Sequence, residues 1–236
     1  MRTIVRTARG DTVDLVATRN PTNAYLSALD TALRARGITS GMGVSDSIAP
    51  IVPPLDTIFT FQSVPLAEIL KHFMKPSQNQ MGEVLVKTLG RLRKGVGIAD
   101  SGVVVVRDQL GSWGVDTSAF VVYDGSGMSR HNLVTAEGIV KILVAMQNDT
   151  TFYASMPIAG VDGTIRNRMR NTAAAGNLRA KTGSLEFVRS LSGYVTTAEN
   201  QRLVFSILSN HFTVPVAETT RMQDAIGVLL ATYRSR

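Results

Sequence analysis

Apolar residues recur at helical spacing in several separate stretches of the chain. Between Pro21 and Gly37 they follow one another at intervals of three and four residues, which predicts an amphipathic helix. Asn20 is a suitable N-cap, Pro21 stands at the first helical position, and Gly37 follows the last turn. The same spacing, ended by Pro76, predicts a helix over 66–74. Further helices are expected at about 77–90, 101–113, 135–147 and 217–233.

Alternation of apolar and polar residues predicts strands, most clearly in the last third of the chain. Three strand-like runs follow one another there, and 198–201 is a hairpin-length connection between the last two. The first 18 residues are expected to form a short hairpin, and Phe120–Tyr123 a short buried strand. The remaining predicted strands are Arg2–Ala8, Thr12–Ala17, Leu178–Leu185, Ser190–Thr197 and Arg202–Ser209. We therefore expect an α/β fold in which the C-terminal helix covers an antiparallel sheet.

Composition removes several kinds of chemistry. The absence of cysteine excludes disulfides and thiolate metal sites. The three histidines, His72, His131 and His211, lack metal-ligand spacing, and the chain contains neither a phosphate loop nor a nucleophile elbow. No metal and no cofactor is therefore expected.

Charge and hydropathy bear on possible partners. The net charge of +7 fits a solvated surface or attraction to polyanions. The basic residues do not interleave with aromatic ones along one segment, so nucleic acid is not an expected partner. No apolar run reaches the roughly 18–20 residues of a membrane span, and Met1–Arg6 lacks the features of a signal peptide.

One short motif carries recognisable chemistry, Lys181-Thr182-Gly183 in the first of the three C-terminal strands. Alternation places Arg179, Lys181 and Gly183 on one face of that strand. If this face borders a cleft, Lys181 supplies a positive charge that attracts a carboxylate or lowers a neighbouring pKa. Gly183 leaves room for a peptide to add along the strand edge. By itself the triplet also describes a surface lysine beside a turn glycine.

A second motif is Ser77-Gln78-Asn79, where a helix is expected to begin. The simplest interpretation is a helix cap. A functional interpretation places both side chains in a cleft, where the Ser77 hydroxyl relays a proton to a leaving amine and the Asn79 amide holds a substrate carbonyl.

Together the two motifs resemble the second and third motifs of penicillin-binding proteins and serine β-lactamases, which are Ser-x-x-Lys, Ser-x-Asn and Lys-Thr-Gly. Further blocks are similar to the D-Ala-D-Ala carboxypeptidase/endopeptidase family, the class C low-molecular-mass penicillin-binding proteins, in the family's order. The matching blocks are 75–90, 124–132, 159–164, 179–185 and 192–195. For the blocks at 124–132 and 159–164 we expect only a role as turns in the fold.

The resemblance implies a DD-peptidase/β-lactamase-like transpeptidase fold, here incomplete, and a serine-type D-Ala-D-Ala carboxypeptidase or endopeptidase. Such an enzyme needs no cofactor and acts outside the cytoplasm, in the periplasm of many bacteria. Its partners are peptidoglycan stem peptides, which it cleaves through an acyl-enzyme, and β-lactams.

Roles for individual residues follow from the same resemblance. Ser77 assists proton transfer to the departing D-Ala and Asn79 positions the substrate. Lys181 and Thr182 hold the terminal carboxylate, and Lys181 also tunes the serine-lysine pair of the first motif. Gly183 and Ser184 belong to the substrate-binding strand, with the N–H of Ser184 as one oxyanion donor.

One family motif is absent, because no serine in the chain has a lysine three residues later. The family inserts extra domains between its first and second motifs. Residues 1–18 are therefore expected to be a remnant of that insertion, and 19–236 the C-terminal part of the catalytic domain. Without the nucleophile the chain is expected to bind but not to acylate. The alternatives are a genuine non-catalytic module that binds peptidoglycan or β-lactams, and an unrelated arginine-rich polyanion-binding protein.

Overall fold

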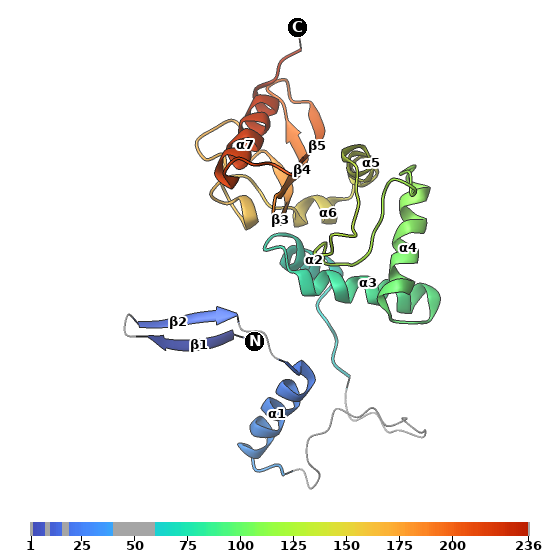
Figure 1. Cartoon of the computed structure of the whole chain (residues 1–236), viewed down its shortest axis with the longest axis vertical. Coiled ribbons are helices and arrows are strands. Elements are labelled where there is room, and N and C mark those ends of the chain that lie inside the picture. The colour runs from blue at the N-terminus through green and yellow to red at the C-terminus, as the bar shows by residue number, and fades with distance from the viewer. Residues whose placement is uncertain (1, 8–9, 16–18, 40–59, 236) are drawn as a thin grey trace. The chain divides into compact units, whose positions relative to one another are not determined.

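The computed structural model describes residues 2–7, 10–15, 19–39 and 60–235 (Figure 1). The chain divides into two compact units, Met1–Phe61 and Gln62–Arg236. In the first unit, strands β1 (Arg2–Thr7) and β2 (Gly10–Leu15) form an antiparallel hairpin as predicted, although Gly10 and Asp11, which lie between the two predicted strands, are paired residues of β2.

The single described helix of the first unit, α1 (Pro21–Arg34), is punctuated as its sequence predicts. The side chain of Asn20 accepts a hydrogen bond of 2.9 Å from the N–H of Asn23, and Gly37 follows the helix with a φ of +75°.

Helices account for much of the second unit, and the four expected at 77–90, 101–113, 135–147 and 217–233 are present within a few residues. A short helix before the sheet and one 3-10 turn were not predicted, because neither is long enough to show a period. In chain order these elements are α2 (Leu66–Met74), α3 (Asn79–Lys94), α4 (Ala99–Ser112), α5 (Ala136–Met146), α6 (Thr150–Ser155), η1 (Gly163–Ile165) and α7 (Val216–Thr232).

The three C-terminal strands form one antiparallel sheet in the order β3-β4-β5, as predicted. They are β3 (Arg179–Leu185), β4 (Val188–Thr196) and β5 (Arg202–Asn210). In the register, Lys181 lies opposite Ser192.

Both faces of this sheet are packed, and strand alternation decides which residue faces which layer. On one face, Leu178 and Ala180 are fully buried together with residues of α7, the helix that lies along the sheet in Figure 1. On the other face, Tyr194 packs on Leu143 of α5 and donates a hydrogen bond of 2.6 Å to its carbonyl. The face that carries Lys181 is therefore the face opposite α7.

The predicted strand Phe120–Tyr123 is wrong, since only Val121 pairs, in a single bridge with Leu133. The side-chain oxygen of Asn132 accepts hydrogen bonds from the N–H groups of both Tyr123 and Asp124, at 2.8 and 3.3 Å. These two N–H groups are therefore not available to pair with a neighbouring strand. Phe120 is buried in a small cluster beneath α4, which explains the apolar character of the segment.

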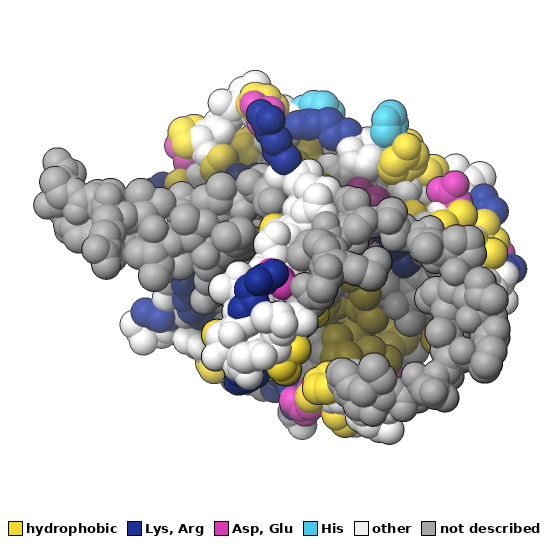
Figure 2. Space-filling model, turned by 90° about the horizontal axis from the view of Figure 1, so that it is seen from below, with side chains coloured by type: hydrophobic (Ala, Val, Ile, Leu, Met, Phe, Trp, Pro, Cys, Tyr) yellow, Lys and Arg dark blue, Asp and Glu magenta, His cyan; other side chains and the backbone are white. Residues whose placement is uncertain are grey.

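Positive charge is spread over the surface. On the face shown in Figure 2, lysine and arginine side chains occupy several separate places. Arg91, Arg93 and Lys94 stand in the last turn of α3, where they complement the negative end of the helix dipole. No helix in the described part of the chain is both long and apolar enough to cross a membrane.

Candidate active site

A cleft of about 1070 Å³ lies beside strand β3 and is bordered by the start of α3 and the loop that contains residues 125–134. All six site residues predicted from the sequence line it. They are Ser77, Asn79, Lys181, Thr182, Gly183 and Ser184. The two motifs lie about a hundred residues apart in the sequence, so the fold brings them together.

Ser77 does not cap a helix. The N-cap position of α3 is Gln78, which makes no side-chain cap bond, so the helix begins close to its predicted start but the interpretation of Ser77 as its cap is wrong. Ser77 instead follows the end of α2 with a φ of +60°, and the N–H of Gln78 reaches back 3.0 Å to the carbonyl of Phe73. This is the left-handed position of a Schellman motif, which glycine usually occupies. Strained backbone at a non-glycine residue is typical of functional sites.

The hydroxyl of Ser77 is engaged by Lys181. The Lys181 ammonium donates hydrogen bonds of 2.6 Å to Ser77 Oγ and 2.8 Å to the carbonyl of Thr182. Burial lowers the pKa of Lys181 from 10.5 to about 8. A lysine with this pKa exchanges its proton readily near neutral pH, and its hydrogen-bonded partner here is a hydroxyl.

Strand β3 has a paired half and an open half. Its first residues pair with the turn before it, through a bond of 3.0 Å from the Ala180 N–H to the Pro157 carbonyl. Among the described residues this pairing stops at Ala180, so the edge of β3 from Lys181 to Leu185 faces the cleft without a further strand. Such an edge can accept an extended peptide.

Gly183 has a reason for being glycine that the sequence did not reveal. A Cβ atom at this position would lie 2.3 Å from Oγ of Ser190 on the neighbouring strand β4. A side chain here would therefore require the Ser190 hydroxyl to move to another rotamer.

The 159–164 block does more than turn the chain. The Asp162 carboxylate forms an ion pair with the Lys75 ammonium, and the N–H of Thr164 donates a hydrogen bond of 3.1 Å to the Lys75 carbonyl. Thr164 also accepts a side-chain hydrogen bond of 2.9 Å from Thr182. This turn thus connects the Ser77 segment to strand β3. Sequence reasoning missed these contacts, and the signal was one charged residue in each of two matching blocks.

The 124–132 block is a loop whose own residues hold it in place by hydrogen bonds, so it does more than turn the chain. The Asp124 carboxylate accepts hydrogen bonds from the N–H groups of Gly127 and Ser129, at 2.7 and 2.8 Å, and from the side chain of Asn132 at 2.9 Å. Burial raises the pKa of Asp124, but these hydrogen bonds outweigh burial and hold the pKa below its usual value of 3.8.

Two contacts attach this loop to helix α3. Glu83 accepts a hydrogen bond of 3.0 Å from the N–H of Ser126. Gly82 and Gly125 touch through their backbones, and a Cβ on either one would lie 2.2 Å from the carbonyl oxygen of the other. The loop wall of the cleft is therefore fixed to the first turns of the helix that carries Asn79.

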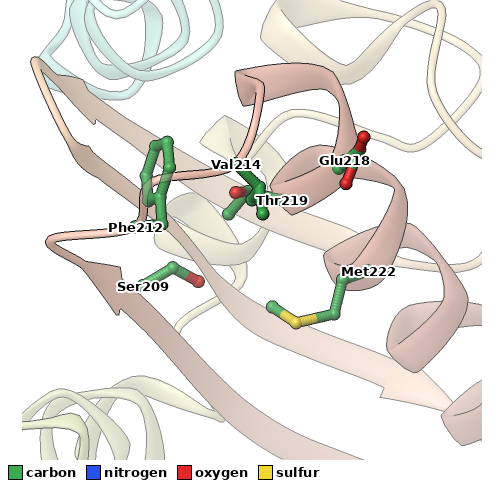
Figure 3. A pocket seen from close by; sticks show the side chains of 6 residues that line it. All are labelled: Ser209, Phe212, Val214, Glu218, Thr219 and Met222. Carbon is green, nitrogen blue, oxygen red and sulfur yellow. The ribbon is translucent and has the colours of Figure 1, made fainter.

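A smaller cavity of about 350 Å³ lies between the end of β5 and the start of α7 (Figure 3). Its lining is mainly apolar, with Phe212, Val214 and Met222 around it and Glu218 as the one charged residue. None of the motif residues borders it.

Comparison with known proteins matches the sequence of this chain to one family. Residues 5–233 match the D-Ala-D-Ala carboxypeptidase 3 (S13) family. The D-alanyl-D-alanine carboxypeptidase of Actinomadura sp. (strain R39) is 46% identical over 179 residues, which are 72% of this chain and 33% of that protein. Carboxypeptidase DacB of Mycolicibacterium smegmatis is 33% identical over 213 residues, or 85% of this chain and 45% of that protein.

Solved structures agree. Penicillin binding protein 4 (dacB) from Haemophilus influenzae, in complex with a β-lactam, superposes with a TM-score of 0.80 at 25% identity, over 99% of this chain and 59% of that one. A class A β-lactamase from Bacteroides cellulosilyticus shares the fold, with a TM-score of 0.55 at 18% identity, over 71% of this chain and 63% of that one. The chain thus spans between a third and three fifths of the two curated relatives and the penicillin binding protein 4 chain.

The resemblance drawn from the motif blocks is confirmed, and so is the α/β fold. The chain belongs to the D-Ala-D-Ala carboxypeptidase 3 (S13) family of serine-type carboxypeptidases.

Proposed function

We propose that this chain forms the walls of the active-site cleft of a D-Ala-D-Ala carboxypeptidase or endopeptidase that cleaves peptidoglycan stem peptides through an acyl-enzyme, outside the cytoplasm. The observation that carries the proposal is the 2.6 Å hydrogen bond between Lys181 and Ser77 inside the cleft. A half-buried ammonium with a lowered pKa, bonded to a hydroxyl, is a proton relay suited to a leaving amine.

Each wall has its part in this reaction. The substrate peptide adds to the open edge of β3 as an extra strand, and Asn79 holds its amide from the opposite wall. Lys181 and Thr182 bind the terminal carboxylate, and the N–H of Ser184 stabilises the oxyanion. Ser77 passes a proton to the departing D-Ala.

The nucleophile of this reaction is proposed to belong to a part of a longer protein that this chain does not include. The chain has no Ser-x-x-Lys motif and spans less than two thirds of its relatives' lengths. The cleft also has an apolar part, which suits a packed protein segment better than a charged peptide end. This part is lined by Leu133, Val134, Ile139, Val188 and Leu208. In this proposal residues 1–18 are a remnant of an inserted domain, and 19–236 are the C-terminal part of the catalytic domain.

The experiment is intact-mass measurement after incubation with a penicillin. The 236-residue chain is expected to gain no adduct, whereas a longer protein that contains Ser-x-x-Lys gains the mass of one penicillin. In that longer protein, Lys181→Ala and Ser77→Ala are expected to slow acylation by roughly 10²-fold or more. A stable adduct on the 236-residue chain contradicts the proposal, as does a longer protein that is never acylated.

A second candidate is a non-catalytic module that binds stem peptides or β-lactams. It is favoured by the same cleft, since the six motif residues line it without a nucleophile. The coding sequence upstream distinguishes the two: an in-frame extension that encodes Ser-x-x-Lys supports the enzyme, and an immediate stop codon supports the module. A polyanion-binding protein is disfavoured by the dispersed basic side chains of the face shown in Figure 2.

A further inference from the structure

The segment between α2 and α3 holds Ser77 in a conformation that costs free energy. A φ of +60° is unfavourable for a residue that carries a Cβ atom. The segment persists only where its surroundings fix it. On the α2 side it is fixed by the bond from Gln78 to Phe73, and on the cleft side by the bond from Lys181 to Ser77.

Asp162 fixes the segment at Lys75, on the side away from the cleft. One oxygen of the Asp162 carboxylate pairs with the Lys75 ammonium, and the other accepts a hydrogen bond of 2.9 Å from the N–H of Ile158. Both charged side chains are partly shielded, with 22% of Lys75 and 34% of Asp162 exposed. Partial burial makes such a pair stronger than a surface pair.

Backbone contacts show how closely the turn approaches. Gly163 has a φ of +62°, and a Cβ there would lie 2.8 Å from the Lys75 carbonyl oxygen. The same carbonyl accepts the N–H of Thr164 at 3.1 Å. The turn therefore contacts both the side chain and the backbone of Lys75, which lies two residues before Ser77.

We propose that Asp162 is a positioning residue for the Ser77 hydroxyl and acts through Lys75. The inference rests on the proposed function, in which Ser77 relays a proton, and assigns to the 159–164 block a part in holding that relay. Asp162 itself does not border the cleft. Its effect is to keep Ser77 Oγ within hydrogen-bond distance of Lys181.

The test uses the 236-residue chain and two readouts that do not require catalysis. Asp162→Asn keeps the shape of the side chain and its bond to Ile158 but removes the charge that holds Lys75. Hydrogen exchange at the Gln78 amide is expected to quicken by roughly tenfold, because the segment opens locally. The NMR titration midpoint of the Lys181 side chain is expected to fall by roughly half a pH unit, because the ammonium loses a hydrogen-bond acceptor.

Matched variants separate positioning from general stability. Asp162→Glu restores the charge and is expected to recover part of both effects. Lys75→Met is expected to reproduce them, and the double variant Asp162→Asn with Lys75→Met to add nothing further. Asp149→Ala removes the cap of α6, where Asp149 accepts the N–H of Phe152 at 2.8 Å, and is expected to lower stability without moving the Lys181 midpoint.

An unchanged Lys181 midpoint in Asp162→Asn overturns the inference, and so does full additivity in the double variant. Neither result bears on the proposed function, because penicillin acylation of the longer protein reports on the nucleophile and not on this turn. Failure of acylation, in turn, leaves the two readouts in the 236-residue chain interpretable.

Discussion

The ammonium nitrogen of Lys181 lies 2.6 Å from the hydroxyl oxygen of Ser77, although 104 residues separate them in the sequence. The hydrogen bonds that the ammonium makes within the described part of the chain go to neutral oxygens, those of Ser77 and Thr182. Lys181 is half-buried, and partial burial of a cation without a carboxylate partner is costly for folding. The contact is therefore expected to serve function at the expense of stability.

Replacement of Lys181 by Met is expected to stabilise the second unit at pH 7. The unfolded chain keeps this proton up to about pH 10.5, whereas the folded chain releases it near pH 8. Below pH 8 Lys181 is charged in the folded protein, which therefore bears the full free-energy cost of desolvating the ammonium. The free energy of unfolding rises as the pH increases from 8 towards 10.5. The gain for Lys181→Met is about 2 kcal/mol at pH 7, after allowance for partial solvent exposure, and disappears near pH 10.5.

Urea unfolding followed by the fluorescence of Trp113, the single tryptophan, measures this gain at both pH values. Lys141 offers a control, since it makes a surface ion pair with Glu137 four residues earlier. Lys141→Met is expected to change stability by less than about 0.5 kcal/mol. A Lys181→Met protein that is less stable than the parent at pH 7 would contradict the buried-cation argument.

A second prediction concerns the backbone of Ser77. Ser77→Gly is expected to stabilise the protein by about 1 kcal/mol relative to Ser77→Ala, because both lose the hydroxyl but only glycine adopts a φ of +60° without strain. The comparison of the two variants by thermal or urea unfolding isolates the backbone effect. Equal stability of the two would show that Ser77 is not strained.

Two helical glycines are expected to respond in opposite directions to alanine. At Gly82 an added Cβ meets the carbonyl oxygen of Gly125 at 2.2 Å, so Gly82→Ala is expected to destabilise by about 3 kcal/mol or more. At Gly111 of α4 the nearest atom to an added Cβ is a Thr117 methyl carbon at 3.8 Å. Gly111→Ala is therefore expected to stabilise by about 0.5–1 kcal/mol through helix propensity.

Denaturant midpoints of the two glycine variants decide the matter. Loss of stability in both would mean that α4 lacks the space described, and a neutral Gly82→Ala would mean that the loop yields easily.

The loop around Asp124 is expected to loosen in acid. Its pKa is lower in the folded protein than in the unfolded chain, so the carboxylate stabilises the loop above about pH 4, and this stabilisation is lost as the pH falls through the folded value. Asp124→Asn is expected to remove most of this dependence. Amide exchange at Gly127 and Ser129, measured between pH 3 and 6 and corrected for intrinsic rates, should show the change in the parent only. The same pH dependence in Asp124→Asn would assign it to another group.

Much of the fold could be predicted because its elements have regular hydrophobic patterns. Helix α7 buries one stripe of its surface, and α1 carries a similar apolar stripe although none of its residues is buried. Such patterns are local and can be read from the sequence. The six-residue helix α6 is too short for a period, and Phe120–Tyr123 looked like a strand because a buried phenylalanine stands in an apolar run. Sequence alone could not show that Asn132 withholds the donors needed for pairing.

The motif residues were found by resemblance, but their geometry was not. The backbone of Ser77 looked like a helix cap because the residue precedes a helix, whereas its conformation is set by the helix before it. The pairs Lys75–Asp162 and Glu83–Ser126 join residues 87 and 43 positions apart, and no local pattern records such distances. These contacts depend on how the turns fold against α3 and β3.

The reciprocal contact of Gly82 and Gly125 has a consequence for what the cleft can admit. Because two backbones rather than two side chains touch, neither wall can yield by changing a rotamer. The helix turn near Asn79 and the loop with Asp124 are therefore expected to move together, as one wall of the cleft. A bulkier ligand is therefore expected to be accommodated by the opposite wall, the hairpin of β3 and β4. Selection for ligand size is expected to act on the residues of this hairpin that line the cleft near its turn, Leu185 and Val188, and not on the glycines.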